Sequence, residues 1–307
     1  MTQVAVLEYF DCQRLDALLG GAADALPAGQ CDVSDVRVLI SGGGLVIDSE
    51  LLAGYPQATT VITGSTGYDH FVLDDLRATG VAGYCTPGYC SREVADFALA
   101  CALAGLRGVV GLDRAMRAGV WEERAAGTTR RVSGSTLGVI GLGKIGALVA
   151  RDAAALGMRV LACDPVASDE AFAAAGARRS ELGDLLAAAD VVTIHAPHVR
   201  GADPLLGRAE VALFKADSIF VNAARAELID IEELIDGLAL GRPAWAFMDV
   251  WDSEPPEPGD HRLDAPNLVL TPHAAWYSPE SEQALYERMA ETAGTALRGD
   301  IGRGLVT

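Results

Sequence analysis

Lysine is nearly missing from this chain, and long apolar runs and closely paired cysteines are missing too. Lys144 and Lys215 are the only lysines among 307 residues, and the formal net charge is −18. A surface this acidic repels phosphate backbones, so we expect no nucleic-acid partner. No stretch reaches the ~20 uninterrupted apolar residues of a membrane helix, so we expect no membrane partner either.

The six cysteines form no CxxC pair and no disulfide framework, so we expect reduced core thiols. The first eight residues lack the basic segment and apolar core of a signal peptide, and they are typical of a first strand. We therefore expect a cytoplasmic protein. A chain of 307 residues is long enough for two domains with separate cores.

The middle of the chain alternates short β-branched runs with alanine-rich helical segments, as in a parallel sheet covered on both faces. The predicted strands are Thr136–Ile140, Arg159–Cys163, Val191–His195, Ile219–Asn222, Ala246–Val250 and Leu268–Leu270. The predicted helices between them are Ile145–Leu156, Glu181–Ala188, Ala209–Phe214 and Ile231–Leu240, the last with Asp230 as N-cap and Gly241 as C-cap. Six strands with short connections predict a complete doubly wound domain.

In the first hundred residues, shorter predicted strands alternate with helices and loops. Strands are predicted at Val4–Leu7, Val36–Ser41, Thr60–Thr63 and Val81–Tyr84, and long helices at Glu93–Leu106 and Glu280–Leu297. We expect the second long helix to cross back onto the first domain. The prediction is an α/β protein with two Rossmann-like domains and a cleft between them. Residues 1–100 plus 277–307 form a smaller, discontinuous, flavodoxin-like domain, and residues 101–276 form the doubly wound Rossmann domain.

A glycine-rich turn joins the first strand of the middle domain to its first helix. It reads Gly141-Leu142-Gly143-Lys144-Ile145-Gly146. The first glycine allows the tight turn, the second lets the backbone approach a pyrophosphate, and the third lets helix and strand pack closely. A strand before it and a helix after it make this GxGxxG motif a prediction of dinucleotide binding, with phosphates at the helix N-terminus.

Asp164, followed by Pro165, ends the second strand of that domain. A carboxylate at this place accepts hydrogen bonds from ribose hydroxyls and repels the 2′-phosphate of NADP. No arginine follows it directly, so the sequence favours NAD (NADH) as the cofactor. The plainer alternative is an aspartate that only caps the strand end.

Polar residues follow three further strands of the same sheet. Arg225, Glu254 and His273 each have a plain interpretation as a loop residue, but three such residues at one sheet edge favour a shared function. Hydride transfer to a 2-oxo acid uses all three. His273 would give the proton to the carbonyl oxygen, Glu254 would orient the imidazole and raise its pKa, and Arg225 would hold the substrate carboxylate and carbonyl.

These motifs together resemble the D-2-hydroxyacid dehydrogenase family over nearly the whole chain. The shared motifs are Gly67-Tyr-Asp-His70, Pro87-Gly88, Glu93-Val-Ala-Asp96, the glycine turn, His195-Ala196-Pro197, Asn222-Ala223-Ala224-Arg225, Asp249 to Pro256 and Thr271-Pro-His273. The resemblance implies Arg225, Glu254 and His273 as the catalytic set. It implies substrate binding by Arg225, His273 and the backbone of Ser65-Thr66-Gly67.

The resemblance also implies cofactor contacts outside the glycine turn. These are Val94, Asp164, Pro165, His195, Ala196, Pro197, Ala223, Ala224, Arg225, Asp249 and His273, which join Gly141, Gly143, Lys144, Ile145 and Gly146. It further suggests a homodimer formed through the nucleotide-binding domains, to which the Glu93–Leu106 helix contributes. His195 and His198 have a spacing that metal ligands can show, but no carboxylate or cysteine accompanies them, so we expect no metal.

The stretch from His273 to Ser278 (His-Ala-Ala-Trp-Tyr-Ser) is similar to one in the C-terminal binding proteins, the branch that includes NADH-responsive co-repressors. There the tryptophan lines the substrate pocket, so Trp276 is a candidate for substrate contact, with core packing as the alternative. The Ser65 loop lacks the basic residue usual at its start, which leaves the substrate open.

An NAD-dependent 2-hydroxyacid dehydrogenase, or 2-oxo-acid reductase, is the function that these residues favour. One alternative is a reductase of a phosphorylated or phosphonate 2-oxo acid in specialised metabolism. Another is an NADH-sensing regulatory protein with little turnover. Formate dehydrogenase, a relative, is disfavoured because its mechanism does not need the Glu–His pair that this chain retains.

Overall fold

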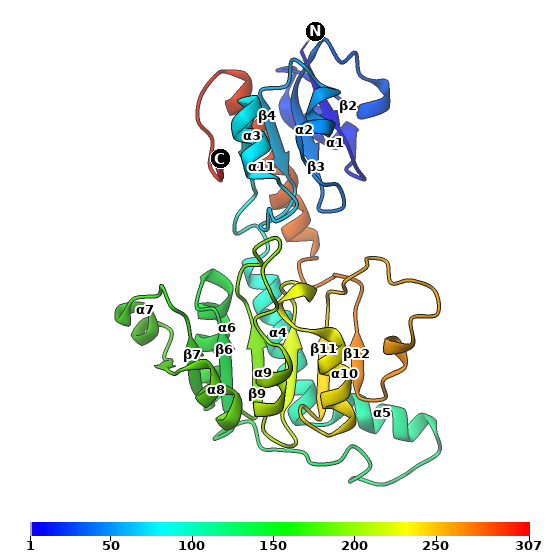
Figure 1. The fold of residues 1–307 in the computed structure, drawn as a ribbon, viewed down its shortest axis with the longest axis vertical. Coiled ribbons are helices and arrows are strands. Elements are labelled where there is room, and N and C mark those ends of the chain that lie inside the picture. The colour runs from blue at the N-terminus through cyan, green and yellow to red at the C-terminus, as the bar shows by residue number, and fades with distance from the viewer. Residues whose placement is uncertain (1) are drawn as a thin grey trace. The chain divides into compact units, whose positions relative to one another are not determined.

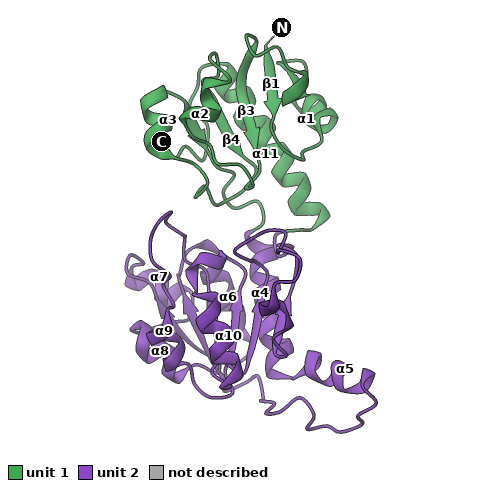
Figure 2. Cartoon of the chain, turned by 45° about the vertical axis from the view of Figure 1, so that its right-hand side comes forward, with its two compact units in different colours: residues 1–90, 277–307 green, residues 91–276 purple. Residues whose placement is uncertain are grey.

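A computed structural model describes residues 2–307. The chain divides into two compact units, one of residues 1–90 and 277–307 (unit 1) and one of residues 91–276 (unit 2) (Figure 2). The first division lies before Ser91 rather than after residue 100, because helix α4 (Ser91–Leu106) packs its small residues Ala95, Ala98 and Ala102 into the core of unit 2. The return crossing lies between Trp276 and Tyr277, at the predicted boundary.

Unit 1 is built on a five-stranded parallel sheet in the order β2-β1-β3-β4-β5, which is the flavodoxin-like order. The strands are β1 (Gln3–Val6), β2 (Asp24–Pro27), β3 (Val36–Ser41), β4 (Thr60–Thr63) and β5 (Ala82–Tyr84). The helices are α1 (Cys12–Leu19), α2 (Ser49–Ala53), α3 (Leu73–Thr79) and α11 (Pro279–Leu297), with a short 3₁₀ turn η1 (Ala28–Gln30). Edge strand β2 was not predicted, because it is short and ends in a proline.

Helix α11 brings the C-terminal part of the chain back to unit 1, as predicted. It packs against α1 and against strands β3 and β4 (Figure 1). Its buried side chains include Leu285, Met289 and Ala293. Ser278 caps its first turn by accepting from the N–H of Ser281 at 2.9 Å, and Pro279 occupies the first helical position, where no N–H is needed.

Unit 2 is a doubly wound domain with a seven-stranded parallel sheet in the order β12-β11-β10-β9-β6-β7-β8. The strands are β6 (Thr136–Ile140), β7 (Arg159–Cys163), β8 (Arg178–Arg179), β9 (Val191–Ile194), β10 (Ile219–Asn222), β11 (Trp245–Met248) and β12 (Leu268–Leu270). All six predicted strands are confirmed to within two residues. The seventh, β8, was missed because it is a pair of exposed arginines with no apolar signature.

Helices cover both faces of this sheet. They are α4, α5 (Val109–Arg117), α6 (Lys144–Ala155), α7 (Asp169–Ala174), α8 (Leu182–Ala188), α9 (Arg208–Leu213) and α10 (Ile231–Ala239), with 3₁₀ turns η2 (Ala226–Leu228) and η3 (His261–Asp264). One core contains residues of α4 and α6, and the other contains residues of α8, α9 and α10. Helices α5 and α7 were not predicted.

The strand order of unit 2 reverses between β6 and β9. In open α/β sheets, ligands bind beyond the carboxyl ends of the strands at such a reversal. The loops that follow β6, β7, β9, β10, β11 and β12 therefore meet at one edge of the sheet.

Helix α10 begins at the predicted N-cap, Asp230, but its C-cap is Leu240, one residue before the predicted Gly241. Asp230 accepts from the N–H of Glu233 at 3.2 Å, and left-handed Gly241 (φ 69°) follows the last turn.

Among residues 2–307, no single helix is both long and apolar enough to cross a membrane. Helices α4 and α5 pass that test only as a pair, and they bend by 60° at the break between them.

Candidate active site

The glycine turn after β6 has the shape that a dinucleotide needs. Gly141 is left-handed (φ 89°), and a Cβ on Gly146 would lie 2.0 Å from the carbonyl oxygen of Gly141. Gly143 is the N-cap of α6, where no side chain caps the helix, and a Cβ there would meet nothing within 4 Å. The open space beside Gly143 leaves the backbone at the N-terminus of α6 accessible, as binding of a pyrophosphate there requires.

Asp164 lies against this turn and is held by the backbone. Its Oδ2 accepts from the N–H of Leu142 at 2.7 Å, and its Oδ1 accepts from Val166 and Ala167 at 2.9 Å each. Burial acts to raise the pKa of Asp164, but these three bonds and the nearby Arg179 outweigh it and lower the pKa. The carboxylate therefore stays ionised, and it joins the end of β7 to the glycine turn.

Arg179 is a neighbour of Asp164 that sequence reasoning missed. Its guanidinium donates to the carbonyl oxygens of Asp164 at 3.1 Å and Ala167 at 2.8 Å, and it pairs with Asp169 at 2.9 Å. It also lies 3.9 Å from the ring centre of Phe172. No arginine directly follows Asp164 in the sequence, but strand β8 brings Arg179 close to it in the fold.

The segment after β9 packs against the glycine turn. A Cβ on Gly141 would lie 2.8 Å from the backbone of His195 and Ala196. The His195 ring contacts the Thr193 hydroxyl through Nε2 at 3.0 Å, and burial lowers the pKa of His195 to about 4, so the ring is neutral. His195 is thus a turn-packing residue, while Pro197 is exposed. No group of three or more His, Cys, Asp or Glu within residues 2–307 is arranged to hold a metal ion.

The turn after β10 presents Arg225. The Asn222 side chain accepts from the N–H of Ala224 at 3.0 Å and donates to the carbonyl oxygen of Arg225 at 2.7 Å, which fixes the turn through Ala223. The guanidinium donates to the carbonyl oxygen of Ala224 at 2.8 Å. Asn222 is fully buried, whereas Arg225 is only partly so.

Asp249, after β11, holds the turn that carries His273. It is buried, and its oxygens accept from the Thr271 hydroxyl at 2.5 Å, the Ala274 N–H at 2.9 Å and the Ala275 N–H at 2.8 Å. His273 itself has a left-handed backbone (φ 51°), and its N–H donates to the carbonyl oxygen of Asp249 at 2.8 Å. Asp249 therefore positions His273, a role that the sequence did not indicate.

Glu254 and His273 form a close pair. Glu254 Oε2 lies 2.7 Å from His273 Nδ1, and Oε1 accepts from the N–H of Trp251 at 3.0 Å. Partial burial acts to raise the pKa of Glu254, but the bonds from His273 and Trp251 and the positive charge of Arg225 outweigh it and lower the pKa. An ionised carboxylate only accepts, so Nδ1 carries the proton and Nε2 is left for another partner.

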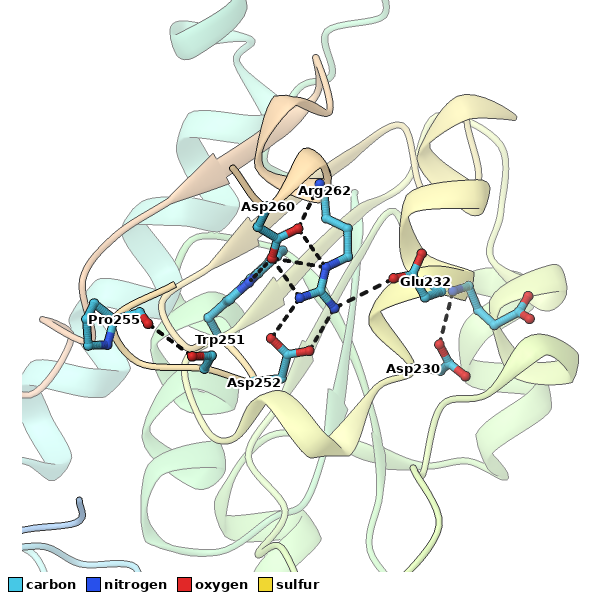
Figure 3. Close-up of polar contacts among 9 residues, drawn as sticks. Asp230, Glu232, Trp251, Asp252, Pro255, Asp260 and Arg262 are labelled. Atoms are coloured by element: carbon cyan, nitrogen blue, oxygen red, sulfur yellow. Dashed lines mark hydrogen bonds and ion pairs between the residues drawn. The ribbon is translucent and has the colours of Figure 1, made fainter. Parts of the chain in front are cut away.

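A second polar cluster supports the loop that carries Glu254. Arg262 forms ion pairs with Asp260 and Asp252 at 2.7 Å each, and the indole N–H of Trp251 donates to Asp260 at 3.0 Å (Figure 3). Sequence reasoning missed this cluster. The only signal was an unusual density of charge, with acidic residues and one arginine close together between Trp251 and Asp264.

The remaining predicted residues lie in different surroundings. Ser65, Thr66 and Gly67 follow β4 in unit 1, where the Ser65 hydroxyl donates to the carbonyl oxygen of Gly67 at 2.5 Å. Val94 is buried in α4, and Trp276 is half-buried. In unit 2 the structure brings together Glu254, His273 and Asp249, with Arg225 near enough to affect Glu254.

Comparison with known proteins agrees with this geometry. Residues 99–275 match the family model described as D-isomer specific 2-hydroxyacid dehydrogenase, NAD binding domain. The chain is 34% identical to the glyoxylate reductase of Korarchaeum cryptofilum, over 89% of this chain and 83% of that protein. A crystal structure of a Thermus thermophilus protein superposes with a TM-score of 0.87 at 29% identity, covering the whole of both chains.

The chain is also 33% identical to the D-3-phosphoglycerate dehydrogenase of Archaeoglobus fulgidus, over 77% of this chain and 45% of that protein. It spans about half the length of the phosphoglycerate dehydrogenases that it matches. The family match covers more than half of the chain, and it falls on the unit that holds the glycine turn and the Glu254–His273 pair. The chain belongs to the D-isomer specific 2-hydroxyacid dehydrogenase family and is an NAD-dependent oxidoreductase.

Proposed function

We propose that this enzyme reduces a small 2-oxo acid with NADH, with His273 as the proton donor. The observation that carries the proposal is the 2.7 Å contact between Glu254 Oε2 and His273 Nδ1. It fixes the tautomer and leaves Nε2 to hold the proton that the substrate oxygen receives. The glyoxylate reductase name of a relative makes glyoxylate the first substrate to test.

The other residues of the site bind or orient the substrate and the cofactor. Arg225 offers a planar guanidinium to the substrate carboxylate and carbonyl oxygen. The backbone of Ser65, Thr66 and Gly67 is the proposed second contact for that carboxylate, and Trp276 the proposed apolar one. When bound, the nicotinamide supplies the hydride. The α6 N-terminus and Asp164 would hold its pyrophosphate and ribose, and Val94, Pro165, Pro197, Ala223 and Ala224 would line the rest.

Turnover with NADH tests the proposal directly. The purified chain is mixed with NADH and glyoxylate, pyruvate, larger 2-oxo acids or a phosphorylated 2-oxo acid, and the loss of NADH absorbance is followed. We expect saturable reduction of at least one unphosphorylated acid, and a kcat lower by roughly 10³-fold for His273→Ala. Tight NADH binding without turnover of any acid would refute the enzyme assignment and favour an NADH sensor.

We also propose that the enzyme is a homodimer formed through unit 2. No side chain of helix α5 is fully buried, and the segment after it exposes Trp121 to 87%. Val109, Met116 and Val120 are exposed beside it in the chain. Exposed apolar side chains that lie close together in the chain, as these do, are typical of a surface that a second subunit covers in a dimer.

The mass in solution tests the dimer. Light scattering should give twice the 32.0 kDa chain mass for the wild type and the single-chain mass for Trp121→Glu. Leu240→Glu, at an equally exposed apolar position on another face, should stay dimeric. A wild-type monomer would refute the proposal.

We also propose a cytoplasmic location, because none of the six cysteines, all within residues 2–307, forms a disulfide, as is usual in a reducing compartment.

A further inference from the structure

Arg262 holds the loop that carries Glu254. Its Nε and one terminal nitrogen bind the two oxygens of Asp260, at 2.9 and 2.7 Å. Both terminal nitrogens bind Asp252, at 2.7 and 3.1 Å, and one lies 3.7 Å from Glu232 on α10 (Figure 3). The guanidinium thus joins the two sides of the loop between Asp252 and Asp260 to each other.

A continuous set of hydrogen bonds runs from this guanidinium to the catalytic histidine. Asp260 Oδ2, bound by Arg262, accepts from the indole N–H of Trp251 at 3.0 Å. The backbone N–H of Trp251 donates to Glu254 at 3.0 Å, and Glu254 holds His273 at 2.7 Å. The Trp251 ring is buried, and the guanidinium lies 5.3 Å from its centre.

This cluster differs from an ordinary surface ion pair, which contributes little. The side chains of Arg262 and Asp260 are only 18% and 7% exposed. Removing Arg262 would leave the Asp260 carboxylate buried without its cation, which is unfavourable. The loop would then rearrange to hydrate Asp260 and would move Trp251 and Glu254 with it.

We propose that Arg262 is a positioning residue for catalysis, which acts through Asp260 and Trp251 to hold Glu254 on His273. The inference rests on the proposed roles of Glu254 and His273. Arg262 bonds to neither of them directly, and it lies on the 3₁₀ turn η3 in the connection between β11 and β12. We therefore expect its removal to affect proton transfer rather than cofactor binding.

Arg262→Met tests the proposal, because methionine keeps the stem and removes every donor. We expect kcat for 2-oxo acid reduction to fall about tenfold, with the Kd for NADH within about twofold of wild type. The acid limb of the pH profile should move to higher pH, because a displaced Glu254 loses the bonds that lower its pKa. Arg262→Lys should recover part of the rate. Arg208→Met, which breaks the 2.8 Å pair with Glu233, is the matched control. It should leave kcat, the Kd for NADH and the acid limb unchanged.

A double-mutant cycle separates positioning from a general loss of stability. If Arg262 acts through Glu254, adding Arg262→Met to Glu254→Gln should cost less than about twofold in kcat. A full tenfold loss in that background, or a fall in melting temperature with no change of kcat or acid limb, would overturn the proposal. Trp251→Phe removes the indole N–H together with part of the ring but leaves Arg262 in place, and it should shift the acid limb in the same direction by less.

Amide exchange provides a measurement that needs no turnover. The Trp251 N–H should exchange at least about tenfold faster in Arg262→Met than in wild type, and at the wild-type rate in Arg208→Met. Unchanged exchange would refute the positioning role even for an active enzyme. If the wild type reduces no 2-oxo acid but exchange still accelerates, the proposed function fails and the loop role of Arg262 stands.

Discussion

Two parallel sheets of similar build carry different chemistry at their carboxyl edges. Beyond the strands of unit 2 lie the guanidinium of Arg225, the imidazole of His273 and the carboxylates of Asp164, Asp249 and Glu254. Beyond β4 of unit 1 lie the hydroxyls of Ser65 and Thr66, bonded to their own loop and to the loop after β5. The scaffold is shared, so the difference comes from the side chains in the loops. This difference is why we propose proton transfer for unit 2 and substrate binding for the Ser65 loop.

The two edges nevertheless fix their loops in the same way. Asp164, Asp249 and Glu254 in unit 2 each accept backbone N–H groups. Glu8 in unit 1 does the same for Gly42 and Gly44. A carboxylate that satisfies main-chain donors holds a loop without a regular strand or helix, because those donors have no other partner. These carboxylates thus hold loops in both units, and of the four only Glu254 also bonds to an imidazole.

The largest expected effect is that of His273→Ala, which removes the proposed proton donor of unit 2. We expect kcat to fall by roughly 10³-fold, because proton transfer loses its donor. NADH binding, measured by fluorescence titration, should stay within about twofold. Lost cofactor affinity with normal residual turnover would break the assignment of chemistry to this edge.

Glu254→Gln should have the next largest effect. The amide keeps the shape but not the charge, so we expect kcat to fall by about 10²-fold. The pKa of Glu254 lies below its ordinary 4.5, so in wild type the charged form persists above that lowered value and is lost as pH falls through it. The acid limb of kcat/KM should therefore lie below pH 4.5 in wild type and disappear in the variant. An acid limb that survives the substitution belongs to another group.

Asp164→Ala tests the cofactor end of unit 2. Loss of the carboxylate should relax the preference for NADH over NADPH by about tenfold, because the repulsion of a 2′-phosphate disappears and Arg179 remains nearby. Asp169→Ala is the matched control, because it frees Arg179 from its 2.9 Å ion pair but leaves Asp164 in place. This variant should relax the preference for NADH over NADPH by less. Unchanged discrimination in Asp164→Ala would remove Asp164 from the ribose site.

The smallest effect is expected in unit 1. Ser65→Ala removes the hydroxyl that holds the Gly67 carbonyl oxygen, so the loop loosens while its backbone donors remain. KM for the 2-oxo acid should rise about threefold, with kcat within about twofold. Ser34→Ala, at an exposed bond to Asp32, should leave both unchanged. A fall in kcat larger than the rise in KM would place chemistry in unit 1 as well.

Sequence patterns predict most of the fold, because buried parallel strands are continuous β-branched runs. The strands at Thr136–Ile140 and Ile219–Asn222 are confirmed to the residue. Strand β8, two arginines at a sheet edge, carries no such pattern, and its absence from the prediction hid Arg179. The boundary before Ser91 was missed because an alanine-rich helix shows no change of composition where the chain passes from one unit to the other.

The candidate site is predictable where a motif fixes a turn. The glycine turn and the Glu254–His273 pair follow from spacing and strand ends. The supporting residues do not, because Asp249 and Arg262 act through contacts that form between segments separated in the chain. Asp249 lies 22 residues from Thr271 in the chain but 2.5 Å from it in space.

The left-handed backbone of His273 has a cost in folding stability. A non-glycine residue in this region costs on the order of 1 kcal/mol, which asparagine or glycine would largely avoid. The fold therefore tolerates at position 273 a residue that it would not select for its own stability. Under the proposed role of His273, replacements that stabilise the turn would abolish proton transfer, so a screen for thermostability alone would select against the histidine.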